Sequence, residues 1–254
     1  MRNVIEIVGD RHLETLGNCG GYYECPKDSD GKRLGPLVGY AGTYDCPGGK
    51  PLQFVGDVYA NFAKAETHAN VLKFFANCLS QRLYARIGLE NDVDVFCGAP
   101  IGGYSLCDAL GLYNNIDMIK MEKKVTVLKT ATSREESELV FSRHDVSSGD
   151  RCVIVEDVCN NLSTMGKAVR LIHSRGAIVV AILCFLNRSP NVDDVYTLLL
   201  DDDSLLQIPV VSLVRKVINE YKQNDPAVSL DIARGNVVWK PKDEWGRLMK
   251  AMHP

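Results

Sequence analysis

The chain has 254 residues, of which 46% are hydrophobic and 24% charged, and its formal net charge is −3. This composition is that of an ordinary globular protein, and the length allows one large α/β domain or one domain with appendages. The near-neutral charge argues against nucleic acid or an anionic membrane as a partner. The N-terminus lacks the apolar core of a signal peptide, and no apolar run approaches the roughly 18 residues that a membrane span needs. We therefore expect a cytoplasmic protein.

The cysteines favour a reducing compartment and no metal site. The three N-terminal ones, Cys19, Cys25 and Cys46, are too widely spaced for the close pair that zinc sites usually contain, and His12 or His68 would have to complete the set. Zinc binding there stays open as an alternative. The other six fall in or beside predicted helices and strands, as small buried hydrophobes do: Cys78, Cys97, Cys107, Cys152, Cys159 and Cys184.

The first 62 residues carry many turn signals, such as Pro47-Gly48-Gly49, and only short extended pieces, Pro36–Tyr40 and Leu52–Val55. We predict an irregular, β-rich N-terminal cap over residues 1–62. A long helix is expected at Ala63–Ile87, because its apolar residues recur at three- and four-residue steps.

From Asp92 onward, short buried strands alternate with helices, except over Glu122–Ser148, a polar excursion that predicts a β-hairpin or a flexible arm. Alternation of this kind predicts an α/β fold, with a mostly parallel sheet flanked by helices. We expect the core at 63–222 and a C-terminal helical extension at 223–254. The predicted elements are strands at 93–97, 116–121, 152–157, 177–186 and 208–211, and helices at 104–112, 163–174 and 212–221.

The most informative segment is Cys152–Gly166, a buried strand that ends in Glu156 and Asp157 and is followed by a polar turn and a helix. Carboxylates at the C-terminal edge of such a strand lie where open α/β sheets bind ligands, and a helix N-terminus favours a phosphate. Together they suit a sugar phosphate. The alternative is a buried strand whose acids cap the next helix.

This order of features resembles the type I phosphoribosyltransferases, which bind phosphoribosyl pyrophosphate (PRPP), and over about residues 55–222 it is most similar to their orotate phosphoribosyltransferases. The resemblance implies that Glu156 and Asp157 hold the ribose hydroxyls and that a loop wraps the 5′-phosphate. Leu162 stands near a usual glycine of that loop. Because leucine does not easily adopt a positive φ, we expect another loop conformation or altered phosphate binding. The PRPP-binding segment implied is Glu156, Asp157, Val158, Cys159, Asn160, Asn161, Leu162, Ser163 and Thr164.

A second block, Gly98–Tyr104, matches the family's pyrophosphate-contacting loop, with Gly102 and Gly103 as PRPP-binding residues. Two neighbouring glycines let backbone N–H groups approach an anion. The family usually has an aromatic residue and a lysine where Ile101 and Gly102 stand, so one cation is missing. Alone, this block would indicate only a tight strand-to-helix turn.

A third block, Lys120-Met121-Glu122-Lys123-Lys124, resembles the family's basic cluster. Lys120 and Lys124 are implied to bind PRPP, and Lys124 joins Glu156 and Asp157 as a catalytic candidate, because ammonium groups stabilise a departing diphosphate. Met121 replaces a further basic residue, and Lys123 and Lys129 are possible substitutes. The alternative is a solvated basic strand edge.

The resemblance also implies an orotate site. Arg188 would pair with the orotate carboxylate through parallel N–H groups. Asn160, Tyr59 and Lys50 are further substrate-binding candidates, with Tyr59 placed to stack on the ring.

The implied activity is transfer of ribose 5-phosphate from PRPP to orotate, giving orotidine 5′-monophosphate and diphosphate. The implied cofactor is Mg²⁺ bound mainly through PRPP, and the implied assembly is a homodimer in which Lys124 serves the neighbouring site. Three alternatives stay open: a phosphoribosyltransferase for another base, a non-catalytic PRPP-binding regulator of the same fold, and a broader PRPP-consuming or nucleotide-salvage protein whose N-terminal cysteines bind zinc.

Overall fold

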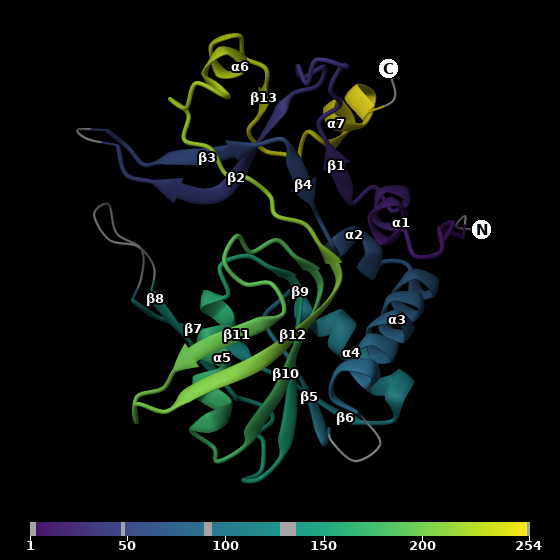
Figure 1. The fold of residues 1–254 in the computed structure, drawn as a ribbon, viewed down its shortest axis with the longest axis vertical. Coiled ribbons are helices and arrows are strands. Elements are labelled where there is room, and N and C mark those ends of the chain that lie inside the picture. The colour runs from purple at the N-terminus through teal and green to yellow at the C-terminus, as the bar shows by residue number, and fades with distance from the viewer. Residues whose placement is uncertain (1–3, 47–48, 89–92, 128–135, 253–254) are drawn as a thin grey trace. The chain divides into compact units, whose positions relative to one another are not determined.

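The computed structural model describes residues 4–46, 49–88, 93–127 and 136–252 (Figure 1). By its internal contacts the chain divides into two compact units. The first contains residues 1–12 and 65–217, and the second contains residues 13–64 and 218–254. In the sequence, the first two boundaries between the units fall within α1 (His12–Asn18) and α2 (Ala63–Glu66).

The first unit is built on a six-stranded sheet with the order β11-β12-β10-β9-β5-β6. All neighbouring strands are parallel except β11 and β12, which pair antiparallel, so the predicted mostly parallel α/β fold is confirmed. The strands are β5 (Val95–Gly98), β6 (Asp117–Lys120), β9 (Arg151–Cys159), β10 (Ile178–Asn187), β11 (Val195–Leu199) and β12 (Leu205–Arg215).

Helices cover both faces of this sheet. The helices α3 (Ala69–Ile87) and α4 (Gly103–Asn114) contact each other, and the ring of Phe75 in α3 lies 4.7 Å from that of Phe185 in β10. On the other face α5 (Ser163–His173) packs in one buried cluster with side chains such as Ile154 of β9. Because helices cover both faces of the sheet, the central residues of β9, Cys152–Val155, are all apolar.

The end of the sheet differs from the sequence prediction. The prediction of a helix at 212–221 is wrong, because β12 continues as one strand to Arg215. The parallel register Ile182↔Val210 runs on to Asn187↔Arg215, so tertiary pairing with β10 decides the conformation of this segment. The antiparallel partner β11 was not predicted. The helix expected over 63–87 is two helices, α2 and α3, separated at Thr67 and His68.

The polar excursion forms the predicted hairpin in its described part. The strands β7 (Glu122–Val127) and β8 (Glu136–Val140) pair antiparallel, with Lys124 opposite Glu138. Residues 128–135, which include Lys129, lie outside the described residues.

The second unit joins segments from both halves of the sequence. Its three-stranded sheet has the order β13-β2-β3, with β2 (Leu37–Tyr44), β3 (Leu52–Gly56) and β13 (Val237–Val238). The strands β1 (Tyr22–Glu24) and β4 (Val58–Ala60) form a second ladder, and the helices α6 (Ser229–Ala233) and α7 (Trp245–Met252) complete the unit.

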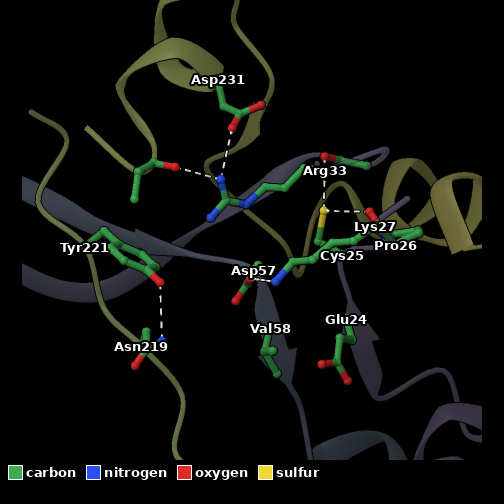
Figure 2. A network of polar contacts seen from close by, with 12 residues as sticks. Glu24, Cys25, Pro26, Lys27, Arg33, Asp57, Val58, Asn219, Tyr221 and Asp231 are labelled. Atoms are coloured by element: carbon green, nitrogen blue, oxygen red, sulfur yellow. Dashed lines mark hydrogen bonds and ion pairs between the residues drawn. The ribbon is translucent and has the colours of Figure 1, made fainter. Parts of the chain in front are cut away.

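Figure 2 shows polar contacts that hold these segments together. The half-buried guanidinium of Arg33 donates to the Ala227 carbonyl at 2.7 Å and pairs with Asp231 at 3.2 Å. The carboxylate of Asp57 pairs with Lys27 at 2.7 Å. Arg33 and its partners Ala227 and Asp231 are about two hundred residues apart in the sequence. These contacts therefore make the C-terminal segment an integral part of this unit.

The cysteines are all free thiols. Cys78, which was predicted to be buried, is only half-buried, while the other five cysteines predicted to be buried are buried, and Cys25 is buried as well. Among the described residues no group of three or more His, Cys, Asp or Glu side chains is arranged to hold a metal ion. Within the same residues, no helix has the length and apolar character needed to cross a bilayer.

Candidate functional site

The carboxyl ends of four parallel strands meet at one edge of the sheet. In the strand register Gly98 of β5 lies beside Val155 of β9 and Lys120 of β6, and Cys159 of β9 lies beside Asn187 of β10. The three sequence blocks singled out above, together with Arg188, therefore converge on this edge, which is where open α/β sheets bind ligands.

The acidic pair stands at the centre of the edge without a basic partner among the described residues. Glu156 is buried, with 8% of its surface exposed, and the N–H of Asp157 donates to its Oε1 at 3.1 Å. Burial, and then the charge of Asp157, raises the pKa of Glu156 to about 9. Asp157 is partly exposed, and its Oδ1 accepts from the Val158 N–H at 2.8 Å.

The alternative role for these acids, capping the next helix, is not what the structure shows. The N-cap residue of α5 is Leu162, whose side chain makes no capping hydrogen bond. Asn161 instead turns the loop, because its Oδ1 accepts from the Ser163 N–H at 3.1 Å. Two carboxyl groups placed at a ligand-binding edge with no basic or capping partner are available to accept hydrogen bonds from hydroxyls.

A third carboxyl group near the pair was missed by the sequence analysis. Burial, and then the charge of Asp157, raises the pKa of Glu66 in α2. Nothing in the sequence places Glu66 there, because it lies ninety residues upstream of the acidic pair in a predicted helix.

The loop after the acids encloses a small cavity of about 180 Å³, lined by Glu156 and residues 158–165. Leu162 has φ 57° and ψ 16°, the left-handed conformation that the sequence analysis expected it to avoid. Its side chain is 3% exposed and belongs to the buried cluster under α5. Burial of the side chain therefore offsets the cost of about 1 kcal/mol that a non-glycine residue has at this conformation.

Substitution of Leu162 separates these two effects. Leu162→Ala and Leu162→Gly both lose the buried side chain, at a cost of about 2–4 kcal/mol, but glycine alone relieves the strained backbone. We expect Leu162→Gly to be more stable than Leu162→Ala by about 1 kcal/mol in urea unfolding, because only glycine adopts this left-handed backbone without strain. An alanine variant as stable as the glycine variant would show that the left-handed backbone is unstrained or not retained.

The glycines of the second block are required by close contacts with β9. A Cβ atom on Gly102 would lie 2.3 Å from Asp157 Oδ1, and one on Gly103 would lie 2.1 Å from the Val155 carbonyl oxygen. The peptide bond between Pro100 and Ile101 is cis. A lysine, which the family usually has in place of Gly102, does not fit beside the carboxylate in this geometry.

Two basic residues of the third block, Lys120 and Lys124, are paired with acids. Lys120 Nζ lies 2.7 Å from Asp108 Oδ2 and 5.5 Å from the centre of the Tyr104 ring. Lys124 lies on the exposed hairpin, 3.4 Å from Glu138. Met121 stands where the family has another cation. Its side chain is fully buried in the core cluster, so it contributes apolar packing there and no charge.

Arg188 follows β10, and its backbone N–H donates to the Cys159 carbonyl at 2.9 Å, so it lies next to the 158–165 loop that lines the small cavity. The side chain of Asn187 before it is fully buried and donates to the carbonyls of Val192 and Asp193, which fixes the turn.

Tyr59 and Lys50 belong to the second unit. Within that unit the Tyr59 ring lies 6.2 Å from the ring of Trp245, and Lys50 is exposed, so their predicted role at the base stays a prediction.

A larger cavity of about 600 Å³ borders the same edge. Two of its basic residues, Arg143 and His144, were not singled out by the sequence analysis. The only sequence signal for them was their place at the end of the polar excursion, which does not distinguish them from other charges there. The cavity is lined by Pro100, Ile101, Tyr104, Lys120, Glu122, Lys123, Arg143 and His144.

Comparisons with known proteins agree with this arrangement. An orotate phosphoribosyltransferase of Methanothermobacter thermautotrophicus is 26% identical over 159 residues, which are 62% of this chain and 77% of that protein. A protein of Methanocella arvoryzae named transcriptional regulator GfcR is 22% identical over 161 residues, 63% of this chain and 72% of its own. No protein-family model matches the chain.

Among solved structures, adenine phosphoribosyltransferase from Saccharomyces cerevisiae has a TM-score of 0.51 at 11% identity, covering 80% of this chain and 98% of that one. This likeness establishes the fold. The chain therefore has the fold of the type I phosphoribosyltransferases, and in sequence it is similar to proteins named orotate phosphoribosyltransferase.

Proposed function

We propose that the protein is an orotate phosphoribosyltransferase, which transfers ribose 5-phosphate from PRPP to orotate. The observation that carries the proposal is the pair Glu156 and Asp157, which stands at the ligand edge with no basic partner among the described residues, beside the small cavity of the 158–165 loop. Carboxyl groups accept from sugar hydroxyls, and N–H groups at a helix start hold a phosphate. The relatives named orotate phosphoribosyltransferase support the same activity.

In this proposal the residues act mainly by positioning. Asp157 and Glu156 hold the ribose 2′- and 3′-hydroxyls, and the loop from Asn160 to Thr164 holds the 5′-phosphate. The bond from ribose C1 to diphosphate breaks with its electron pair on the diphosphate oxygen, and a ring nitrogen of orotate bonds to C1 and releases its proton to water. The protein has little proton transfer to perform, so orientation and preorganised charge supply most of the rate enhancement.

Mg²⁺ fits this site as a partner of PRPP. The carboxylate of the partly exposed Asp157 and the oxygens of a diphosphate are the ligand types that Mg²⁺ prefers, and it usually combines one or two carboxylates with substrate phosphates. Bound there, the ion would neutralise charge on the diphosphate. Lys120 and Lys124 would contribute in the same direction once released from Asp108 and Glu138.

Arg188 tests the choice of base. With PRPP and Mg²⁺ present, we expect turnover with orotate to exceed that with uracil, adenine or hypoxanthine by at least about 100-fold, because a guanidinium selects a carboxylate. Arg188→Ala is expected to raise KM for orotate about 10- to 100-fold, whereas Arg188→Lys keeps the charge and loses the parallel pair of N–H groups. Equal turnover with another base, unaffected by Arg188→Ala, would contradict orotate as the substrate.

A second candidate function is a PRPP-binding regulator. Two observations favour it: the cation positions of the family are occupied here by Gly102, which contacts Asp157, and by the buried Met121. A relative named as a transcriptional regulator points the same way. Tight binding of PRPP by calorimetry, without release of diphosphate in the presence of any base, would favour the regulator over the enzyme.

A further inference from the structure

The larger cavity at the sheet edge concentrates positive charge. Four basic side chains and one acidic side chain line its volume of about 600 Å³, with the Tyr104 ring between them. The basic residues come from two segments, with Lys120 and Lys123 at the start of the hairpin and Arg143 and His144 just after it. An excess of positive charge in a concave site attracts anions and favours ligands with several negative charges.

The turn that carries Arg143 and His144 is anchored on both sides. Leu139 and Val146 are each 8% exposed and belong to the buried cluster, with Phe141 packed against it. The carboxylate of Asp145 pairs with Arg175 at 3.0 Å. The two basic side chains therefore project from a fixed backbone, although both are exposed themselves.

Arg143 and His144 differ from Lys120 in their pairing. Lys120 is held by Asp108 at 2.7 Å, whereas Arg143 and His144 have no ion-pair partner among the described residues. A guanidinium presents a fixed fork of N–H donors that matches two oxygens of a phosphate. A ligand that enters the cavity can therefore use Arg143 without first breaking an ion pair with a described residue.

One loop separates this cavity from the acidic pair. Gly102 contacts the Asp157 carboxylate, while its neighbours Pro100 and Ile101 line the cavity. A sugar whose hydroxyls meet Asp157 can therefore extend a charged substituent across the loop towards the cations. The 5′-phosphate has a separate place, in the cavity of about 180 Å³ beside Leu162.

We propose that Arg143 and His144 bind the diphosphate group, and so replace the cations that this chain lacks at Gly102 and Met121. This inference rests on the proposed use of PRPP. Arg143 contacts two diphosphate oxygens, and the His144 ring donates to a third. As the bond to C1 breaks, the electron pair remains on the diphosphate, and these donors hold the charge that results.

The test is calorimetric titration with inorganic diphosphate and Mg²⁺, which requires no turnover. We expect Arg143→Ala to weaken diphosphate binding at least about 10-fold and the double variant with His144→Ala further, because charge-assisted bonds to phosphate are lost. Arg86→Ala is the matched control, since it removes the same charge from an exposed side chain of α3. Its affinity for diphosphate is expected to equal that of the unchanged protein.

The outcomes separate this inference from the proposed function. If the unchanged protein fails to bind diphosphate, or binds it equally after Arg143→Ala, the inference is wrong, whatever the orotate assay gives. If diphosphate binding depends on Arg143 but no base is converted, the binding site stands and the enzymatic function fails. Equal unfolding temperatures of the variants exclude a folding defect as the cause.

Discussion

Replacing Asp157 by Asn is expected to lower kcat/KM for PRPP by about 100- to 1,000-fold, with little change in unfolding temperature. The amide keeps the shape of the side chain and one acceptor oxygen, so Val158 retains its hydrogen bond. It loses the negative charge that would strengthen bonds to the ribose hydroxyls and stabilise positive charge at C1, and such losses cost this much in other enzymes. Steady-state kinetics with PRPP as the varied substrate measures the effect.

The control for this experiment is Asp117→Asn. Asp117 is exposed at the start of β6, which is the opposite edge of the parallel sheet. The same loss of charge there is expected to leave kcat/KM within about 2-fold, because exposed charges separated by more than a Debye length are screened. Comparable activity of the Asp157 and Asp117 variants would show that the acidic pair takes no part in the reaction.

Stability is expected to depend on pH through Glu156. Its pKa is raised to about 9 in the folded protein, first by burial and then by the charge of Asp157. Between its ordinary value near 4.5 and this value, the folded state holds a proton that the unfolded chain has released. The free energy of unfolding therefore falls as pH rises through this window, and the loss is complete above the folded pKa.

Glu156→Gln isolates this contribution, because glutamine resembles the protonated carboxyl group and does not titrate. We expect the variant to gain stability over the unchanged protein by at least about 2 kcal/mol between pH 5 and pH 9, since one pKa unit corresponds to about 1.4 kcal/mol. Urea unfolding at each pH measures the difference, in which the titration of all other groups largely cancels. Parallel pH profiles for the two proteins would mean that Glu156 ionises normally.

The part of the fold that sequence predicted well is the part fixed by local pattern. The buried strand with Glu156, the following helix and the glycine at 176 with φ 75° all occur where periodicity and turn chemistry indicated them. The hairpin after Glu122 was predicted for the same reason. Convergence of the acidic pair, Lys120 and Arg188 on one sheet edge follows from the parallel topology alone.

The features that were missed depend on contacts between distant residues. Pairing with β10 keeps Ser212–Arg215 in a strand, and a local pattern does not contain that information. The left-handed conformation of Leu162 is maintained by burial of its side chain, which only the packed core reveals. Glu66, Arg143 and His144 reach the site from segments whose own sequence carries no functional motif.

The second unit is discontinuous in sequence, and this has a consequence for folding on the ribosome. β13 pairs with β2, so this edge of β2 stays open until Val237 and Val238 have been synthesised. The long intervening segment adds only a small entropic cost to closure, because that cost grows with the logarithm of length. During synthesis, however, the nascent β2 edge is exposed to other chains. We expect C-terminal truncation before Val237 to increase aggregation well before it affects the parallel sheet.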